Sequence, residues 1–264
     1  MTVMLRKALW DLRWTALWFA VGGAGYTFFV SLFYPTFRNQ SQTIARLIAT
    51  YPKGVLAALG YTDLSTFSGY MGTESLNVFW PIITLVFATL AGAALVAKEV
   101  EDGTSEIWLS VPAARWRLLL GKMCALAVGL VGAVVACVAV LALSALLVGA
   151  TLTASGLLAM AVVMLAFLLT VAAYSGLLSS LLSARGVAAG ISLGITLVFY
   201  ALWLVGGLAD QWKQLKNISI FTAYTPQKAL ETGAVDWLSI AILLVITAVC
   251  VLAAVVSFQR RDAI

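Results

Sequence analysis

Long apolar runs recur along the chain, and they constrain its fold more than any other feature. The runs are rich in Leu, Ala and Val, and each is long enough to cross a hydrocarbon core of roughly 30 Å. In lipid every backbone polar group must find its partner within the protein, so these runs must be helices; the alternation typical of barrel strands is absent. With 62% hydrophobic and 10% charged residues, the sequence predicts an all-α polytopic membrane protein.

The apolar runs predict six transmembrane helices in a single domain, residues 1–264, with no internal repeat. The expected spans cover approximately residues 14–34, 78–97, 121–149, 157–182, 187–208 and 237–258. Residues 1–13 place leucines on one helical face and basic side chains on the other, which predicts an N-terminal interfacial helix. A signal peptide is the competing interpretation, but no small-residue cleavage site follows a compact apolar core.

One polar segment, Lys98–Lys122, separates the second run from the third. It holds eight of the 27 charged residues in the chain. Gly103 is expected to end the helix that leaves the membrane, Thr104 has the chemistry of an N-cap, and Pro112 cannot continue a helix. These signals predict a short helix over residues 105–110. An ordinary charged surface loop is the alternative, and the residues alone do not separate the two.

The distribution of basic residues predicts the orientation. If the N-terminus lies inside the cell, the inner segments carry ten of the 16 Lys and Arg residues and the longer outer loops carry six. Basic residues concentrate on the cytoplasmic side of membrane proteins. Both termini and the segment 98–122 are therefore expected to be cytoplasmic.

The order of residues in the polar segment resembles the loop after the second span of type-2 ABC exporter permeases. The resemblance covers a small part of the chain and rests on Glu99, Gly103, Thr104, Glu106, Leu109, Pro112, Arg115 and Lys122. In that family the loop forms a coupling helix that docks in a cleft of the ATP-hydrolysing subunit. The resemblance implies that the ATPase-docking residues here are Glu99, Gly103, Thr104, Glu106, Ile107, Leu109, Pro112 and Arg115.

The same resemblance implies a function and partners. The chain would be the membrane-spanning permease subunit of an ABC exporter, coupling ATP hydrolysis by a separate ATPase subunit to export of a hydrophobic or amphipathic drug, peptide or lipid. Two ATPase copies would hold the ATP and Mg, and this chain would hold no cofactor. The permease would form a homodimer, or a heterodimer with a related permease, in a bacterial inner (plasma) membrane.

Other chemistry finds little support in the sequence. There is no Gly-x-x-x-x-Gly-Lys-Ser/Thr loop to hold ATP phosphates and no histidine, so no catalytic, cofactor-binding or metal-binding residue is predicted and the chain is not expected to be an enzyme. The three cysteines lie in apolar runs, which disfavours a disulfide framework. All carboxylates, Glu74 among them, are expected outside the spans, whereas ion-driven carriers keep ionisable groups within them. A secondary transporter and a non-transporting scaffold or immunity protein remain the alternatives.

Three glycines at every fourth position, Gly186, Gly190 and Gly194, form a small-residue face on the fifth span. Small residues at this spacing let helices approach closely in lipid. The face is expected to pack within the chain or, as the alternative, against another subunit.

Overall fold

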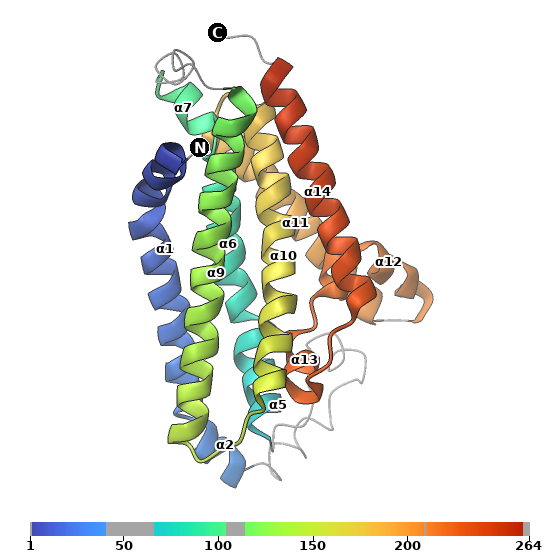
Figure 1. Ribbon diagram of the computed structural model, residues 1–264. Coiled ribbons are helices and arrows are strands. Elements are labelled where there is room, and N and C mark those ends of the chain that lie inside the picture. Colours follow the sequence, from blue (N-terminus) through green and yellow to red (C-terminus); the bar gives the residue numbers. More distant parts are fainter. Residues whose placement is uncertain (1, 41–65, 104–113, 209, 261–264) are drawn as a thin grey trace.

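The structure is a computed structural model that describes residues 2–40, 66–103, 114–208 and 210–260 (Figure 1). Every regular element in these ranges is helical. Five helices, and one pair of helices bent by 41°, are long and apolar enough to cross a membrane. The predicted all-α polytopic fold is confirmed, and the spans number six if the bent pair crosses once.

The elements run in the order α1 (Thr2–Ser31), α2 (Tyr34–Asn39), α5 (Phe67–Met71), a π-helical turn (Gly72–Leu76), α6 (Phe79–Ala93), α7 (Ala97–Glu101), α9 (Arg115–Leu147), α10 (Ala154–Leu181), α11 (Arg185–Leu208), a 3₁₀ turn (Asp210–Trp212), α12 (Lys213–Ile218), a 3₁₀ turn (Ile220–Ala223), α13 (Pro226–Thr232) and α14 (Trp237–Arg260).

Helix α1 differs from the prediction because it includes the residues expected to form a separate interfacial helix. It continues from Thr2 to Ser31 without interruption. No glycine or proline lies between residues 2 and 21, so nothing in the local sequence breaks the helix. The guanidinium of Arg13 lies 3.0 Å from the ring centroid of Trp10, an aromatic–cation pair suited to a membrane surface.

The second span begins earlier than predicted, because α5 and the π-helical turn precede α6. Polar residues made this stretch look like a loop, but two of its backbone carbonyls accept hydrogen bonds from neighbouring elements. The Tyr26 hydroxyl donates to the Glu74 carbonyl at 3.0 Å, and the Tyr224 hydroxyl donates to the Leu76 carbonyl at 2.9 Å. Glu74 lies half-buried within the bent pair; if this pair crosses the membrane, Glu74 lies inside a span, contrary to the prediction for the carboxylates.

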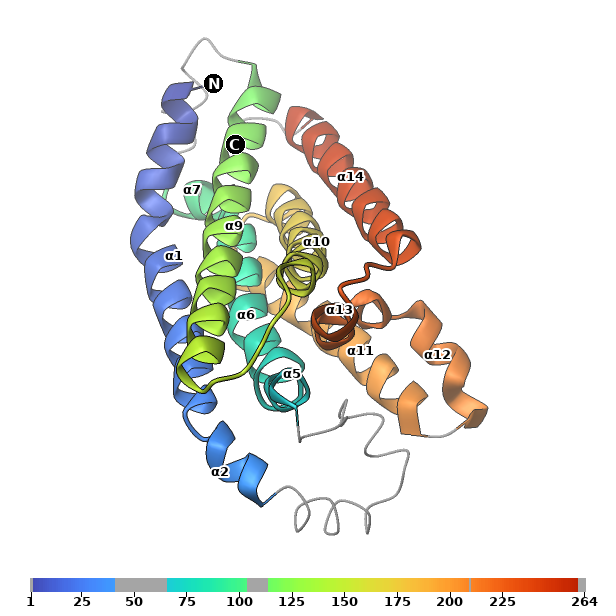
Figure 2. The ribbon, with the colours of Figure 1, turned by 60° about the horizontal axis from the view of Figure 1, so that its bottom comes forward.

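Helix α10 is the centre of the bundle. Its most apolar stretch is 67% buried, against at most 33% for the other single-helix spans, and it packs against α6, α9, α11, α13 and α14 (Figures 1 and 2). Small residues bring α6 close to it: a Cβ on Gly92 would lie 2.7 Å from the Ser175 Cβ. Such contacts replace the hydrophobic effect as the force between helices in lipid.

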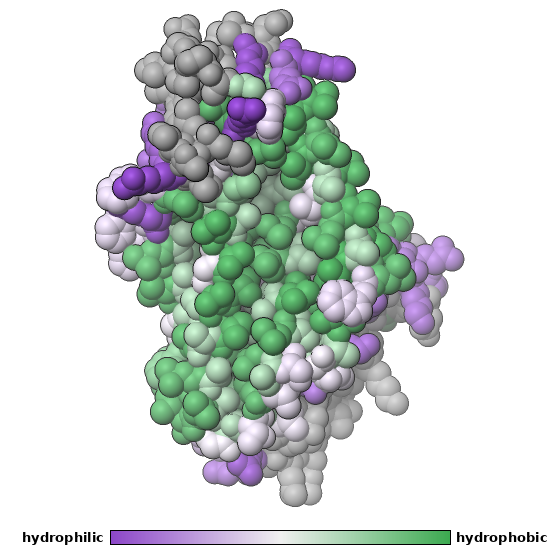
Figure 3. Space-filling model, viewed as in Figure 1, coloured by the Kyte–Doolittle hydropathy of each residue, from purple (hydrophilic) through white to green (hydrophobic). Residues whose placement is uncertain are grey.

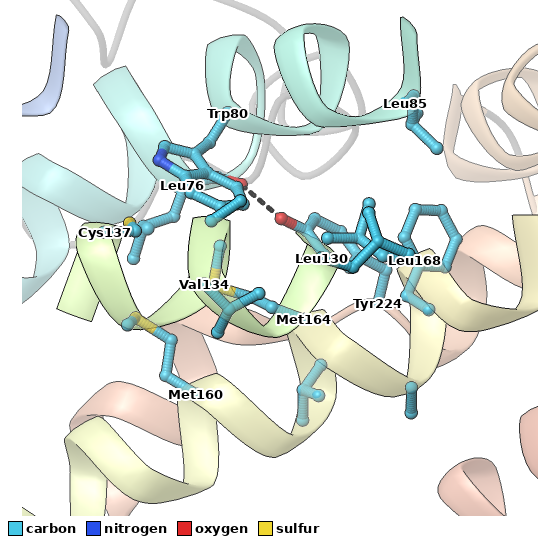
Figure 4. Packing of buried hydrophobic residues seen from close by; sticks show 14 of the residues in the cluster. Leu76, Trp80, Leu85, Leu130, Val134, Cys137, Met160, Met164, Leu168 and Tyr224 are labelled. Atoms are coloured by element: carbon cyan, nitrogen blue, oxygen red, sulfur yellow. Dashed lines mark hydrogen bonds between the residues drawn. The ribbon is translucent and has the colours of Figure 1, made fainter. Parts of the chain in front are cut away.

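The short helix α13 lies beside the end of α10 that is farther from α7 (Figure 1). Pro226 occupies its first turn and Gly233 ends it with a left-handed φ of 66°. The Asn77 side-chain amide donates to the Gln227 amide oxygen at 2.7 Å, and Gly72 leaves the space that Gln227 fills. Tyr224, just before α13, joins the aromatic core against Phe167 with ring centroids 4.6 Å apart; Figure 4 shows its bond to Leu76.

The surface carries a broad apolar band between more polar ends (Figure 3). Side chains such as Val135, Leu197 and Val249 are more than half exposed on three different long helices. Water-soluble monomers rarely expose continuous apolar areas of this extent, whereas lipid covers them without cost. The first residues of α1, the last of α14, and α7 all lie at one end of the bundle (Figure 1).

Candidate functional site: the base of the polar loop

The polar segment predicted to dock a partner leaves the bundle through a break between α6 and α7. Helix α6 ends at Ala93, and α7 begins at Ala97 in a different direction after the turn at residues 94–96. No proline lies between residues 82 and 111, and Gly92 precedes the turn. No proline therefore explains the break, and side chains of the surrounding helices bind its backbone groups.

Ser179 of α10 binds the buried backbone groups that this break leaves without helical partners. The amide groups of Val96 and Ala97 donate to its Oγ at 2.9 and 3.0 Å, and its hydroxyl donates to the Ala93 carbonyl at 2.7 Å. Groups of this kind have no partner within their own helix where a helix begins or ends. Because Ser179 is fully buried, no water would replace these bonds.

Lys122 ties the same region to α9. Its ammonium donates to the Leu95 carbonyl at 2.7 Å and forms an ion pair with Glu99. The two side chains are 13% and 24% exposed, so the pair is partly shielded from water. The ammonium thus compensates the charge of Glu99 on α7, and its hydrogen bond to the Leu95 carbonyl holds it in place.

Glu101 makes the third attachment of α7, a hydrogen bond to α11. Its Oε2 accepts a hydrogen bond from the Arg185 backbone amide at 2.8 Å, at the first residue of α11. A carboxylate is favoured there because the N-terminus of a helix carries a partial positive charge. Helix α7 is therefore bonded to three spans: α9, α10 and α11.

The segment leaves α7 at Gly103, as the sequence predicted. Gly103 has a φ of 68°, a conformation that glycine adopts without strain, and its amide donates to the Val100 carbonyl at 3.2 Å. The segment returns at Arg115, the first residue of α9. Both flanks of the loop thus emerge from ordered helices at the same end of the bundle.

Comparison with known proteins identifies the family. The model of a family described as "ABC-2 family transporter protein" matches residues 26–263. The chain belongs to the ABC-2 transporter family. A search among curated proteins gives no match. The resemblance to type-2 ABC permeases is confirmed, and the chain has the role of an ABC transporter permease in a membrane.

In this ABC-2 permease the structure describes three of the predicted docking residues. Glu99 is paired with Lys122, Gly103 is the left-handed turn, and Arg115 begins α9. The other predicted docking residues lie outside the described residues: Thr104, Glu106, Ile107, Leu109 and Pro112. The short helix predicted over residues 105–110 lies there too, so the docking role of the loop stays a prediction.

The predicted glycine face of the permease is open. A Cβ built on Gly186, Gly190 or Gly194 would meet no atom within 4 Å, and all three residues are exposed. These glycines therefore make no close helix contact with the rest of the described chain. Among the glycines that do so are Gly92, Gly156, Gly176 and Gly206.

Sequence reasoning missed the residues that hold the loop base. Ser179 is one of several serines in a long apolar run, and its partners are more than 80 residues away. The pairing of Glu99 with Lys122 likewise depends on how α7 turns. No local signal distinguishes these residues from others of their type.

Proposed function

We propose that this ABC-2 permease is a transmembrane subunit that exports a hydrophobic or amphipathic substrate, driven by ATP hydrolysis in a separate ATPase subunit. Families of this kind normally work with such a subunit and generally lack an ATPase site of their own. The polar loop at residues 98–122 faces the cytoplasm and docks on the ATPase. A complete transporter contains two permease chains and two ATPase chains in a bacterial inner membrane.

The observation that carries this proposal is the threefold attachment of α7. The helix that leads into the loop is bonded to α9 through Lys122, to α10 through Ser179 and to α11 through Glu101. A partner that binds the loop therefore pulls on three spans at once.

The test is co-purification of the partner ATPase with Glu106→Ala and Leu109→Ala variants, together with a transport assay. Truncating a buried contact of a small interface costs about 1–4 kcal/mol, so each variant should lose the ATPase or its stimulation of transport while still inserting in the membrane. Glu231→Ala is the matched control, because this exposed carboxylate lies at the opposite end of the bundle. The chain alone should hydrolyse no ATP. Full ATPase binding and full transport by both variants would refute the docking role.

A secondary transporter is the alternative that one observation favours. Glu74 is a half-buried carboxylate inside the bent span, and ion-coupled carriers use such groups. A hydrolysis-deficient ATPase separates the two functions: export should stop with it, whereas an ion-driven carrier would continue to respond to an imposed proton or sodium gradient. A non-transporting scaffold would show transport under neither condition.

A further inference from the structure

The attachment of α7 to α10 differs from the other two because a single neutral hydroxyl makes it. We propose that Ser179 is a positioning residue that makes α7 and α10 move as one unit, so that a displacement of the docked loop reaches the central helix of the permease. This inference rests on the proposed function for the loop, but the bonding of the hydroxyl can be tested without a partner.

The chemistry of the break makes this hydroxyl hard to replace. The α6–α7 turn leaves the Val96 and Ala97 amides and the Ala93 carbonyl without helical partners, and Ser179 bonds all three. Ala93 and Ala97 are fully buried and Val96 is 3% exposed, so solvent does not compete. One side chain of α10 thus caps both helix ends, a role that residues close in sequence usually fill.

Close packing on the same face prevents α6 and α10 from sliding past one another. A Cβ on Gly92 would lie 2.7 Å from the Ser175 Cβ and 3.1 Å from the Ala172 carbonyl oxygen. A Cβ on Gly176 would lie 3.1 Å from Leu95 Cδ1, within the turn itself. Packed interfaces of this density move as blocks rather than deform.

The position of α10 lets the attachment carry a movement of α7 across the bundle. This helix contacts α6, α9, α11, α13 and α14, so it reaches both ends of the bundle. At its far end Gly156 lies against the Leu230 carbonyl of α13. A movement of α7 that is passed to α10 therefore reaches the opposite end of the permease through one rigid helix.

The first experiment measures amide hydrogen exchange at Val96 and Ala97 in the full chain in lipid nanodiscs. In Ser179→Ala these amides lose their acceptor, and exchange there should speed up by roughly tenfold or more. Ser175→Ala is the matched control: Ser175 is equally buried on α10, but its hydroxyl donates to the Val171 carbonyl of its own helix. Unchanged or slower exchange in Ser179→Ala would overturn the proposal.

The second experiment measures transport per ATP hydrolysed in the complex with the ATPase. Ser179→Ala should lower this ratio several-fold at unchanged ATPase binding, Ser175→Ala should leave it unchanged, and Ser179→Thr, which keeps the hydroxyl, should restore it. An unchanged ratio in Ser179→Ala would refute the positioning role even if exchange changes. Failure of the wild-type chain to bind the ATPase would instead refute the proposed function.

If Ser179→Ala does not assemble, the wild-type complex supplies the deciding measurement. The Val96 and Ala97 amides should then remain protected from exchange in both the nucleotide-free and the ATP-bound states, because α7 and α10 move together. Loss of protection in either state would show that the two helices separate during the cycle and would overturn the proposal.

Discussion

At the scale of single residues, polar side chains hold together the places where the helices of this permease are interrupted. Tyr224 is such a residue: it is buried, and its hydroxyl donates to the Leu76 carbonyl at the end of the π-helical turn. Burial raises the pKa of Tyr224 well above its usual value of 10.0, so the phenol remains a protonated donor throughout the physiological pH range. The bend of the second span thus depends on a residue almost 150 positions away.

We predict that Tyr224→Phe lowers the free energy of unfolding by about 1–3 kcal/mol, because it leaves a buried carbonyl without a donor while preserving the ring. Thermal or denaturant unfolding in detergent measures this. Tyr200→Phe is the control, because the Tyr200 side chain is 36% exposed, and it should change stability little. Equal stability of the two variants would mean that the bond to Leu76 contributes nothing.

At the scale of elements, some glycines let two helices pack closely where a side chain would clash. A Cβ on Gly156, in the first turn of α10, would lie 2.2 Å from the Leu230 carbonyl oxygen of α13. The obstacle is backbone, so one of the two helices would have to move. Gly22 in α1 differs, because a Cβ there would meet nothing within 4 Å.

We predict opposite effects for the two alanine substitutions. Gly156→Ala should lower the free energy of unfolding by about 1–3 kcal/mol through overpacking, whereas Gly22→Ala should raise it by up to about 1 kcal/mol because alanine favours the helix. Thermal unfolding of both variants in the same detergent provides the comparison. A Gly156→Ala variant as stable as the wild-type chain would show that α13 is not packed tightly on α10.

At the scale of the whole molecule, the open glycine face of α11 bears on assembly. A Cβ at Gly190 would meet no atom of the described chain within 4 Å, so a substitution there should not lower the stability of a single chain. Small residues that face lipid in one chain let two chains approach closely. This is consistent with a dimer interface, which remains a proposal.

We predict that Gly190→Leu lowers the dimer fraction in detergent or nanodiscs without lowering the thermal stability of the monomer. Gly132→Leu in α9 is the matched control, because Gly132 is also exposed and open, and it should leave assembly unchanged. Light scattering or cross-linking measures the dimer fraction. An unchanged fraction in Gly190→Leu would remove this face as the interface.

The sequence by itself determined the class of fold and most of the spans. An apolar run as long as the bilayer is thick must be helical, because its backbone polar groups find no partner in lipid. The helices α9, α10, α11 and α14 therefore lie close to their predicted limits. The order of Glu99, Gly103 and the residues after them was also sufficient to indicate the family that residues 26–263 match. The end of α7 at Gly103 followed from the backbone freedom of glycine.

Only the tertiary structure decided where helices break and what polar groups do inside the bundle. The turn at residues 94–96 contains no helix-breaking residue, and Ser179 and Lys122 supply partners for its backbone groups from other helices. Glu74 looked like a loop residue, yet it lies in the bent helix pair, where Tyr26 and Tyr224 bind the backbone around it. The physical reason is that lipid and close packing remove water as a partner, so the backbone groups at these breaks need partners within the protein, and side chains distant in sequence supply them.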